Sequence, residues 1–93
     1  MRITWDPKKA DANARKHGID FQEAATLFTD TLSTTFPSEV HSESEARFLT
    51  IGISIRQRVL VVAHTEDDNM IRIISARTAT PQEKRFYEKG QSH

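Results

Sequence analysis

Apolar residues between positions 20 and 30 recur at the spacing of an amphipathic helix. They stand at i, i+3, i+4 and i+7, namely Phe21, Ala24, Ala25 and Phe28. Asp20 is a suitable N-cap for this segment, and Glu23, three residues later, completes a capping box. The pattern predicts a helix that ends near residues 29–30 and packs its apolar stripe against a core.

The residues before this segment predict another helix, preceded by a short strand over residues 2–5. Asp6 and Pro7 suit the N-cap and first helical position, because a carboxylate accepts free backbone N–H groups and proline has none to satisfy. Gly18 ends the helix, and the basic residues of its last turn suit the helix dipole. We expect this helix over residues 7–17.

Beyond residue 30 the apolar period shortens to two, which predicts strands. The expected strands span residues 32–36, 46–55, 58–66 and 70–77, with a polar loop over residues 38–45 and turns at residues 56–57 and 67–69. Pro37 has no backbone N–H, so the first of these strands should lie at a sheet edge. Thr80, Pro81 and Glu83 repeat the chemistry of a helix start, and Gly90 ends this last helix.

This order of elements is typical of an α+β domain. One strand and two helices come first, three or four antiparallel strands follow, and a helix closes the chain. We therefore expect residues 1–93 to form a single domain. It should contain a small antiparallel sheet of three to five strands, two N-terminal helices and one C-terminal helix.

The chain has no net charge, with 13 basic and 13 acidic residues, which by itself argues against a nucleic-acid partner. The charges are unevenly distributed, however. Residues 1–17 contain five Lys or Arg and two Asp, residues 18–55 one Arg and six acids, and residues 56–93 seven basic and five acidic residues. Either the basic ends meet in space and form a cationic patch, or the charges are scattered over the surface.

The composition also narrows the class of protein. The absence of cysteine excludes disulfides and thiolate chemistry and favours a cytoplasmic location. No apolar run approaches the roughly 20 residues that span a bilayer, and no secretory leader precedes Trp5. We expect a soluble protein without membrane contact.

Four histidines invite a metal site, but their spacing does not support one. No metal-binding pattern is matched by His17, His41, His64 and His93. Asp67 and Asp68 resemble part of a calcium loop but fit a turn better, and the three isolated glycines form no phosphate-binding loop. We expect neither a metal nor a cofactor.

The last predicted strand carries two arginines among isoleucines. Arg72 and Arg77 are five residues apart, so a regular strand directs them to opposite sheet faces. In one interpretation, an arginine lies at a sheet end or pairs with Glu66 or Asp68. In the other, a guanidinium held on a rigid strand binds phosphate through two parallel hydrogen bonds.

Other side chains also have two interpretations. His64 is either a buried core residue or a proton carrier, and His17, which follows Lys16, is either a helix C-cap contact or part of a site. Tyr87 either packs in the core or stacks on a base, and core packing is the simpler expectation for it and for Trp5. RNA cleavage without metal needs a base, an acid and cations for the phosphorane charge, and the chain contains residues of each type.

An ordered set of short motifs resembles the BrnT family of bacterial toxins along nearly the whole chain. The motifs are Trp5-Asp6-Pro7-x-Lys9, Asn13-x-x-Lys16-His17-Gly18-Ile19-x-Phe21-x-Glu23-Ala24, Glu45-x-Arg47-Phe48, Gly52, Ile71 to Arg77, Ala79-Thr80, Glu83 and Tyr87. The resemblance implies a compact relative of the RelE-like ribonucleases that cuts RNA without metal or cofactor and halts translation. It also implies a BrnA-type antitoxin with a ribbon-helix-helix DNA-binding region. The toxin would then reach DNA only through the antitoxin, in a dimeric or heterotetrameric complex.

The candidate catalytic residues that this resemblance implies are Lys16, His17, His64, Glu66, Arg72, Arg77 and Tyr87. We expect the two arginines to bind phosphate and Lys16 to bind phosphate or stabilise charge. Proton transfer falls to His17, or to His64 with Glu66. One departure is Asp67-Asp68, where the family usually has a basic residue, and these carboxylates should weaken the attraction for RNA.

Two other functions fit the same residues. In the first, the chain is a catalytically weak or inactive binding module that partners the antitoxin as a transcriptional co-repressor. In the second, it is an interaction domain that contacts nucleic acid weakly through its basic ends. RNA cleavage by the isolated chain distinguishes the toxin from both.

Overall fold

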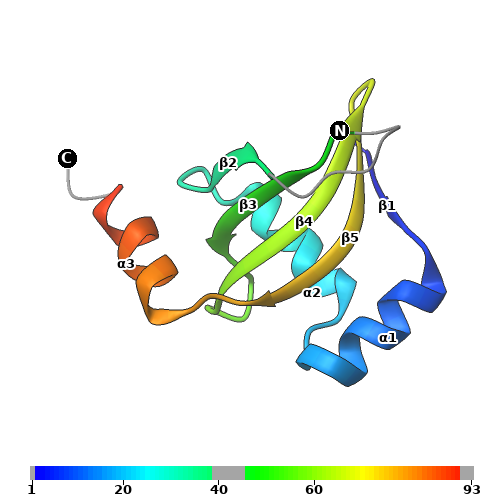
Figure 1. Cartoon of the computed structure of the whole chain (residues 1–93), viewed down its shortest axis with the longest axis horizontal. Helices are drawn as coiled ribbons and strands as arrows, with labels where there is room; N and C mark the ends of the chain where they lie inside the picture. Colours follow the sequence, from blue (N-terminus) through cyan, green and yellow to red (C-terminus); the bar gives the residue numbers. More distant parts are fainter. Residues whose placement is uncertain (1, 39–45, 91–93) are drawn as a thin grey trace.

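The computed structural model describes residues 2–38 and 46–90, which form three α-helices, one 3-10 helix and five strands (Figure 1). In chain order these are β1 (Arg2–Trp5), α1 (Pro7–His17), α2 (Phe21–Thr26), the 3-10 helix η1 (Leu27–Thr29), β2 (Thr34–Pro37), β3 (Phe48–Ile53), β4 (Val59–Asp67), β5 (Met70–Thr78) and α3 (Pro81–Lys89). The expected loop over residues 38–45 lies almost wholly outside the described residues, as do His41 and His93.

The ends of α1 are set by the residues that predicted them. Asp6 Oδ1 accepts the backbone N–H of Lys8 at 2.9 Å, and Pro7 is the first helical residue. Gly18 ends the helix with a φ of +70°, a left-handed conformation that strains residues with a Cβ. The prediction of a helix over residues 7–17 is confirmed.

The second predicted helix is divided. α2 ends at Thr26, and the chain continues as the 3-10 helix η1 instead of remaining α-helical to residues 29–30. η1 packs closely on β3 at Gly52, where a Cβ would stand 2.8 Å from Leu27 Cδ1 and 3.0 Å from Ser33 Cβ. This close approach requires a glycine in the strand.

The five strands form one mixed sheet in the order β1-β5-β4-β3-β2. β1 runs parallel to β5, with Ile3 opposite Ile71, whereas the other neighbours are antiparallel. The expectation of a purely antiparallel sheet is therefore wrong. β1 pairs with a strand far along the chain, and no local signal in residues 2–5 specifies that partner or its direction. The sheet and the three helices nevertheless make the fold α+β.

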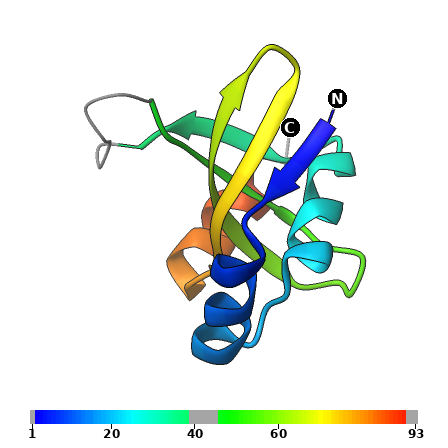
Figure 2. The ribbon, with the colours of Figure 1, turned by 90° about the vertical axis from the view of Figure 1, so that its right-hand side faces the viewer.

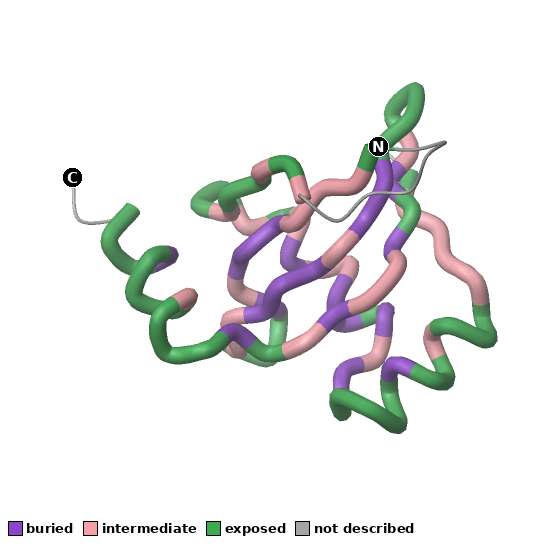
Figure 3. The backbone as a smooth tube through the Cα atoms, in the orientation of Figure 1, coloured by how far each residue is buried: buried purple, intermediate pink, exposed green. Residues whose placement is uncertain are grey.

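The helices lie on both sides of the sheet (Figure 2). α1 and α2 cover one side, called here the helical face, and α3 packs on the opposite side, called here the outer face. The core of the helical face consists of Ile19, Phe21, Ala24, Leu27, Leu60, Val62, Ile73 and Ala76. The smaller core of the outer face consists of Ile51, Val61, Ala79 and Tyr87. Figure 3 shows that α3 is exposed along most of its length, so it covers only part of its face.

None of the helices in residues 2–38 and 46–90 combines the length and apolar character that crossing a bilayer requires.

Candidate nucleic-acid interface

A bulge in β5 places Arg72 and Arg77 on the same face of the sheet. Along β4, Ala63 lies opposite Ser75 and His64 opposite Ile73, so Ile74 is an extra residue without a partner in the register. The extra residue resets the alternation of side chains. Ile73 and Ala76 consequently share the helical-face core, and both arginines lie on the outer face. The expectation that the arginines face opposite ways is wrong for this reason.

The two arginines differ in their surroundings. Arg72 is exposed, lies opposite Thr65 of β4, and makes no ion pair with any residue that the structure describes. The interpretation in which this arginine pairs with Glu66 or Asp68 is therefore wrong for Arg72. With the bulge allowed for, Arg72 and Arg77 stand roughly 13 Å apart along the strand, since each regular step is about 3.3 Å.

Arg77 is held by the first turn of α3. Its Nη1 and Nη2 atoms donate to Glu83 Oε1 at 2.7 Å and to Oε2 at 3.0 Å. Glu83 also accepts the backbone N–H of Thr80, and Thr80 Oγ1 accepts that of Glu83, which confirms the predicted capping box. The Arg77 hydrogen bonds lower the pKa of Glu83 to about 2. Glu83 therefore occupies the guanidinium group of Arg77. An RNA phosphate would have to displace Glu83 to bind it.

This ion pair predicts an acid-dependent loss of stability. The folded-state pKa of Glu83, about 2, lies below its ordinary value of 4.5. The pair therefore stabilises the fold fully above about pH 4.5, and the stabilisation is lost as the pH falls towards 2. We expect Glu83→Gln to remove this part of the pH dependence of the unfolding free energy, measured by urea denaturation across the acid range. Asp11→Asn, at an exposed carboxylate of α1, is the control, and equal acid dependence in Glu83→Gln and the parent chain would contradict the prediction.

His64 is completely buried on the helical face. Its Nε2 lies 2.7 Å from Thr50 Oγ1, which in turn lies 2.7 Å from Thr35 Oγ1. Its ring meets Phe28 edge-on and stacks on Phe48, with centroid distances of 5.1 and 6.0 Å. The role of His64 in proton transfer remains a prediction. RNA could reach His64 only if the rings of Phe28 and Phe48 moved.

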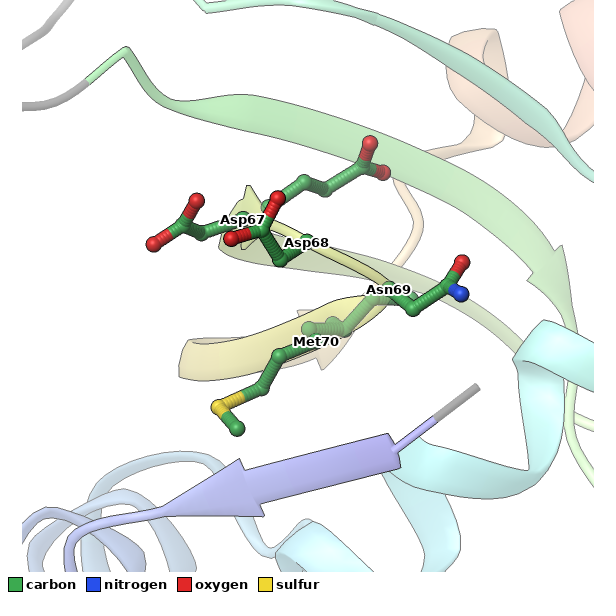
Figure 4. Close-up of a pocket in the computed structure, with 6 residues that line it drawn as sticks. Asp67, Asp68, Asn69 and Met70 are labelled. Carbon is green, nitrogen blue, oxygen red and sulfur yellow. The ribbon is translucent and has the colours of Figure 1, made fainter.

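Glu66 lies beside His64 and leads into an acidic hairpin. Its Oε1 is 3.7 Å from His64 Nδ1, an atom with no hydrogen-bond partner among the described residues. Burial lowers the pKa of His64, and the Glu66 carboxylate offsets this only in part. A pocket of about 230 Å³ at the turn is lined by Glu66, Asp67, Asp68, Asn69, Met70 and Ile71 (Figure 4). Its carboxylates repel phosphate and should weaken RNA binding at this end of the sheet, where Arg72 also lies.

Asn13 joins α1 to the C-terminal part of β5, at the end of the strand away from the acidic hairpin. Its side-chain amide donates to the carbonyl of Ala76 at 2.8 Å and accepts the N–H of Ala76 at 3.0 Å. Lys16 and His17 follow within one helical turn and are exposed. The last turn of α1 thus lies beside the C-terminal part of β5, whereas α3, with the basic residues of the other chain end, lies on the opposite face of the sheet (Figure 2).

Tyr87 is an anchor of α3 and is 7% exposed. Its hydroxyl donates to Asp30 Oδ2 at 2.5 Å, and Asp30 also accepts the backbone N–H groups of Ile53 and Leu32. Burial opposes the charge of Asp30, but these hydrogen bonds outweigh it and lower the pKa of the carboxyl. The structure places Tyr87 in the core of the outer face, as the simpler interpretation expects.

Sequence reasoning missed the true role of Glu23. Asp20 Oδ1 accepts the backbone N–H of Glu23 at 2.6 Å, but the Glu23 side chain does not return to Asp20. It accepts a hydrogen bond from Ser54 Oγ at 2.7 Å and forms an ion pair with Arg58. The Arg58 hydrogen bond lowers the pKa of Glu23. The expected capping box at α2 is therefore only half formed, because the carboxylate joins α2 to the β3–β4 turn.

The candidate catalytic residues do not form one cluster. The outer face holds Arg72, Arg77 and Tyr87, the end of α1 holds Lys16 and His17, and the helical face holds His64 and Glu66. No three His, Asp or Glu side chains within residues 2–38 and 46–90 are arranged to share a metal ion. Among these candidates, the cationic residues lie on the outer face and at the end of α1.

Known proteins similar to this chain point to one family. A family model described as a ribonuclease toxin, BrnT, of type II toxin-antitoxin systems matches residues 5–83. The crystal structure of the Brucella abortus ribonuclease toxin BrnT resembles this chain with a TM-score of 0.66 and 25% sequence identity, covering 86% of this chain and 97% of that one. No curated protein matches the chain. With the family model spanning most of its length, this chain belongs to the BrnT family of ribonuclease toxins of type II toxin-antitoxin systems.

Proposed function

We propose that this chain is a metal-independent endoribonuclease that cleaves RNA and inhibits translation in the bacterial cytoplasm. The observation that carries the proposal is the bulge at Ile74, which brings Arg72 and Arg77 onto one sheet face while α1 and α2 occupy the other. A rigid strand with two guanidinium groups on the face that α3 covers only in part is suited to RNA phosphates. A BrnA-type ribbon-helix-helix antitoxin neutralises the toxin, and DNA is contacted only through that antitoxin.

The reaction needs only groups that protein side chains supply. The RNA 2′-oxygen attacks the neighbouring phosphorus and loses its proton to a base, while the bond to the 5′-oxygen breaks and that oxygen takes up a proton. Arg72 binds a phosphate, and Lys16, in the last turn of α1 beside the C-terminal part of β5, stabilises charge. We assign both proton transfers to His17, which accepts the 2′-hydroxyl proton and returns it to the 5′-oxygen, because His17 is exposed whereas His64 is buried.

A catalytically inactive binding module is the second candidate function. It is favoured by the Glu83 carboxylate, which occupies Arg77, and by the acidic hairpin at residues 66–68. Both features reduce the number of cations free to bind RNA. In this alternative the chain acts as the partner of the antitoxin and as a co-repressor.

Incubation of the purified chain with total RNA in excess EDTA separates the two functions. We expect new RNA fragments in EDTA, and growth arrest in cells that express the chain, relieved by the antitoxin. Cleavage that stops in EDTA and returns with added magnesium would disprove metal independence. Intact RNA under both conditions, with normal growth, would leave only the binding module.

A further inference from the structure

A groove of about 400 Å³ separates α3 from strands β2 and β3 on the outer face. Its lining residues are Thr34, Phe36, Ile51, Gln82, Glu83 and Phe86. Phe86 is 55% exposed, and its ring meets that of Phe36 edge-on with 6.4 Å between centroids. A large apolar side chain half in water beside an apolar groove is a common feature of protein interfaces.

The charges around this groove favour an acidic partner. Gln82 and Lys89 lie four and three residues from Phe86, so helix geometry places them on the same side of α3, with Arg85 adjacent. Arg85 and Lys89 are exposed. Glu83, the carboxylate in the groove, is already paired with Arg77. The groove therefore combines an apolar floor with a cationic rim.

The edge strand beside the groove is poorly suited to pairing with another strand. β2 has four residues and ends at Pro37, which lacks a backbone N–H. A partner is therefore better accommodated as a helix in the groove than as an added strand.

We propose that this groove is the docking site for an acidic amphipathic helix of the antitoxin. An apolar side chain of that helix packs against Phe36 and Phe86, and its carboxylates face Arg85 and Lys89. The inference rests on the antitoxin partner of the proposed function, but it does not depend on RNA cleavage by this chain.

The test uses the full chain, purified alone, and its cognate BrnA-type antitoxin. Phe86→Asp should weaken binding in isothermal titration calorimetry at least about 30-fold, since truncating a central aromatic anchor typically has an effect of this size. Arg85→Glu combined with Lys89→Glu should slow association and reduce its salt dependence. Ile55→Asp, at a side chain that is 73% exposed in the β3–β4 turn, is the matched control and should bind normally. Thermal unfolding of each variant checks that the fold is intact.

The outcomes separate this site from the proposed function. A Phe86→Asp chain that still cleaves RNA in EDTA but is no longer inhibited by the antitoxin supports the site. Reduced binding by a chain that never cleaves RNA supports the site and refutes the nuclease. Normal binding by Phe86→Asp, loss of binding in Ile55→Asp, or dimerisation of the free chain through Phe86 in light scattering would overturn the inference.

Discussion

Replacing Asn13 by alanine is expected to lower the free energy of unfolding by about 3 kcal/mol. β1 pairs with β5 only as far as Trp5 opposite Ile73, so Ala76 has no strand partner on that side. The Asn13 side chain takes that place with hydrogen bonds to both backbone groups of Ala76, and it also donates to the carbonyl of Ile19 at 3.0 Å. Alanine leaves these groups unsatisfied in the interior, at about 1–3 kcal/mol each, and its better helix propensity offsets only a few tenths of this.

Urea denaturation of the parent chain and of Asn13→Ala measures this difference in unfolding free energy. Gln22→Ala removes an exposed amide from α2 and is the matched control, expected to change stability by no more than about 0.5 kcal/mol. A loss below about 1 kcal/mol for Asn13→Ala would mean that water or neighbouring groups satisfy Ala76. Because the same contact fastens α1 to β5, Asn13→Ala should also disorder Lys16 and His17 relative to Arg77.

The second large effect is expected on activity. Arg72→Ala should reduce RNA cleavage roughly 10- to 100-fold, because it removes hydrogen bonds between charged groups that position the RNA, each worth about 1.5–3 kcal/mol. Arg72→Lys retains the charge but not the paired N–H donors, so its activity should lie between that of Arg72→Ala and that of the parent chain. Initial rates of cleavage of a labelled RNA, with the unfolding temperature measured in parallel, give the comparison.

Arg72 is a sharper test than Arg77 because replacing it breaks no ion pair among the residues that the structure describes. Arg77→Ala would leave Glu83 without its partner and would loosen α3 at the same time. Arg56→Ala, at an exposed arginine of the β3–β4 turn, is the matched control and should cleave RNA normally. Equal rates for Arg72→Ala and the parent chain would remove Arg72 from the site and would question the outer face as the RNA surface.

Local chemistry predicted the helix starts correctly. Asp6 and Pro7 begin α1, and Thr80 with Pro81 begins α3, because a cap depends on groups only two or three residues apart. The same reasoning was only partly correct at Glu23, because a buried carboxylate meets stronger partners at Ser54 and Arg58 than the free N–H of its own helix.

Among the candidate site residues, the sequence predicted the chemical types better than their arrangement. Tyr87 and His64 are both in the core, and for His64 the apolar residues around it in the sequence indicate this. The partner of Arg77 was not expected, although Glu83 was already predicted as a cap residue. That pairing depends on how α3 turns back onto the end of β5, which no short-range pattern encodes.

The sequence by itself determined the α+β class, the extents of α1 and of the main strands, and the motifs that indicate the family. Only the tertiary structure decided that β1 is parallel to β5 and that Arg72 and Arg77 share a face. Both depend on hydrogen bonds between strands, in which one extra residue at Ile74 shifts every later side chain of β5 to the other side. The alternation of residue types does not reveal that extra residue, because both faces of this central part of the sheet contain apolar side chains.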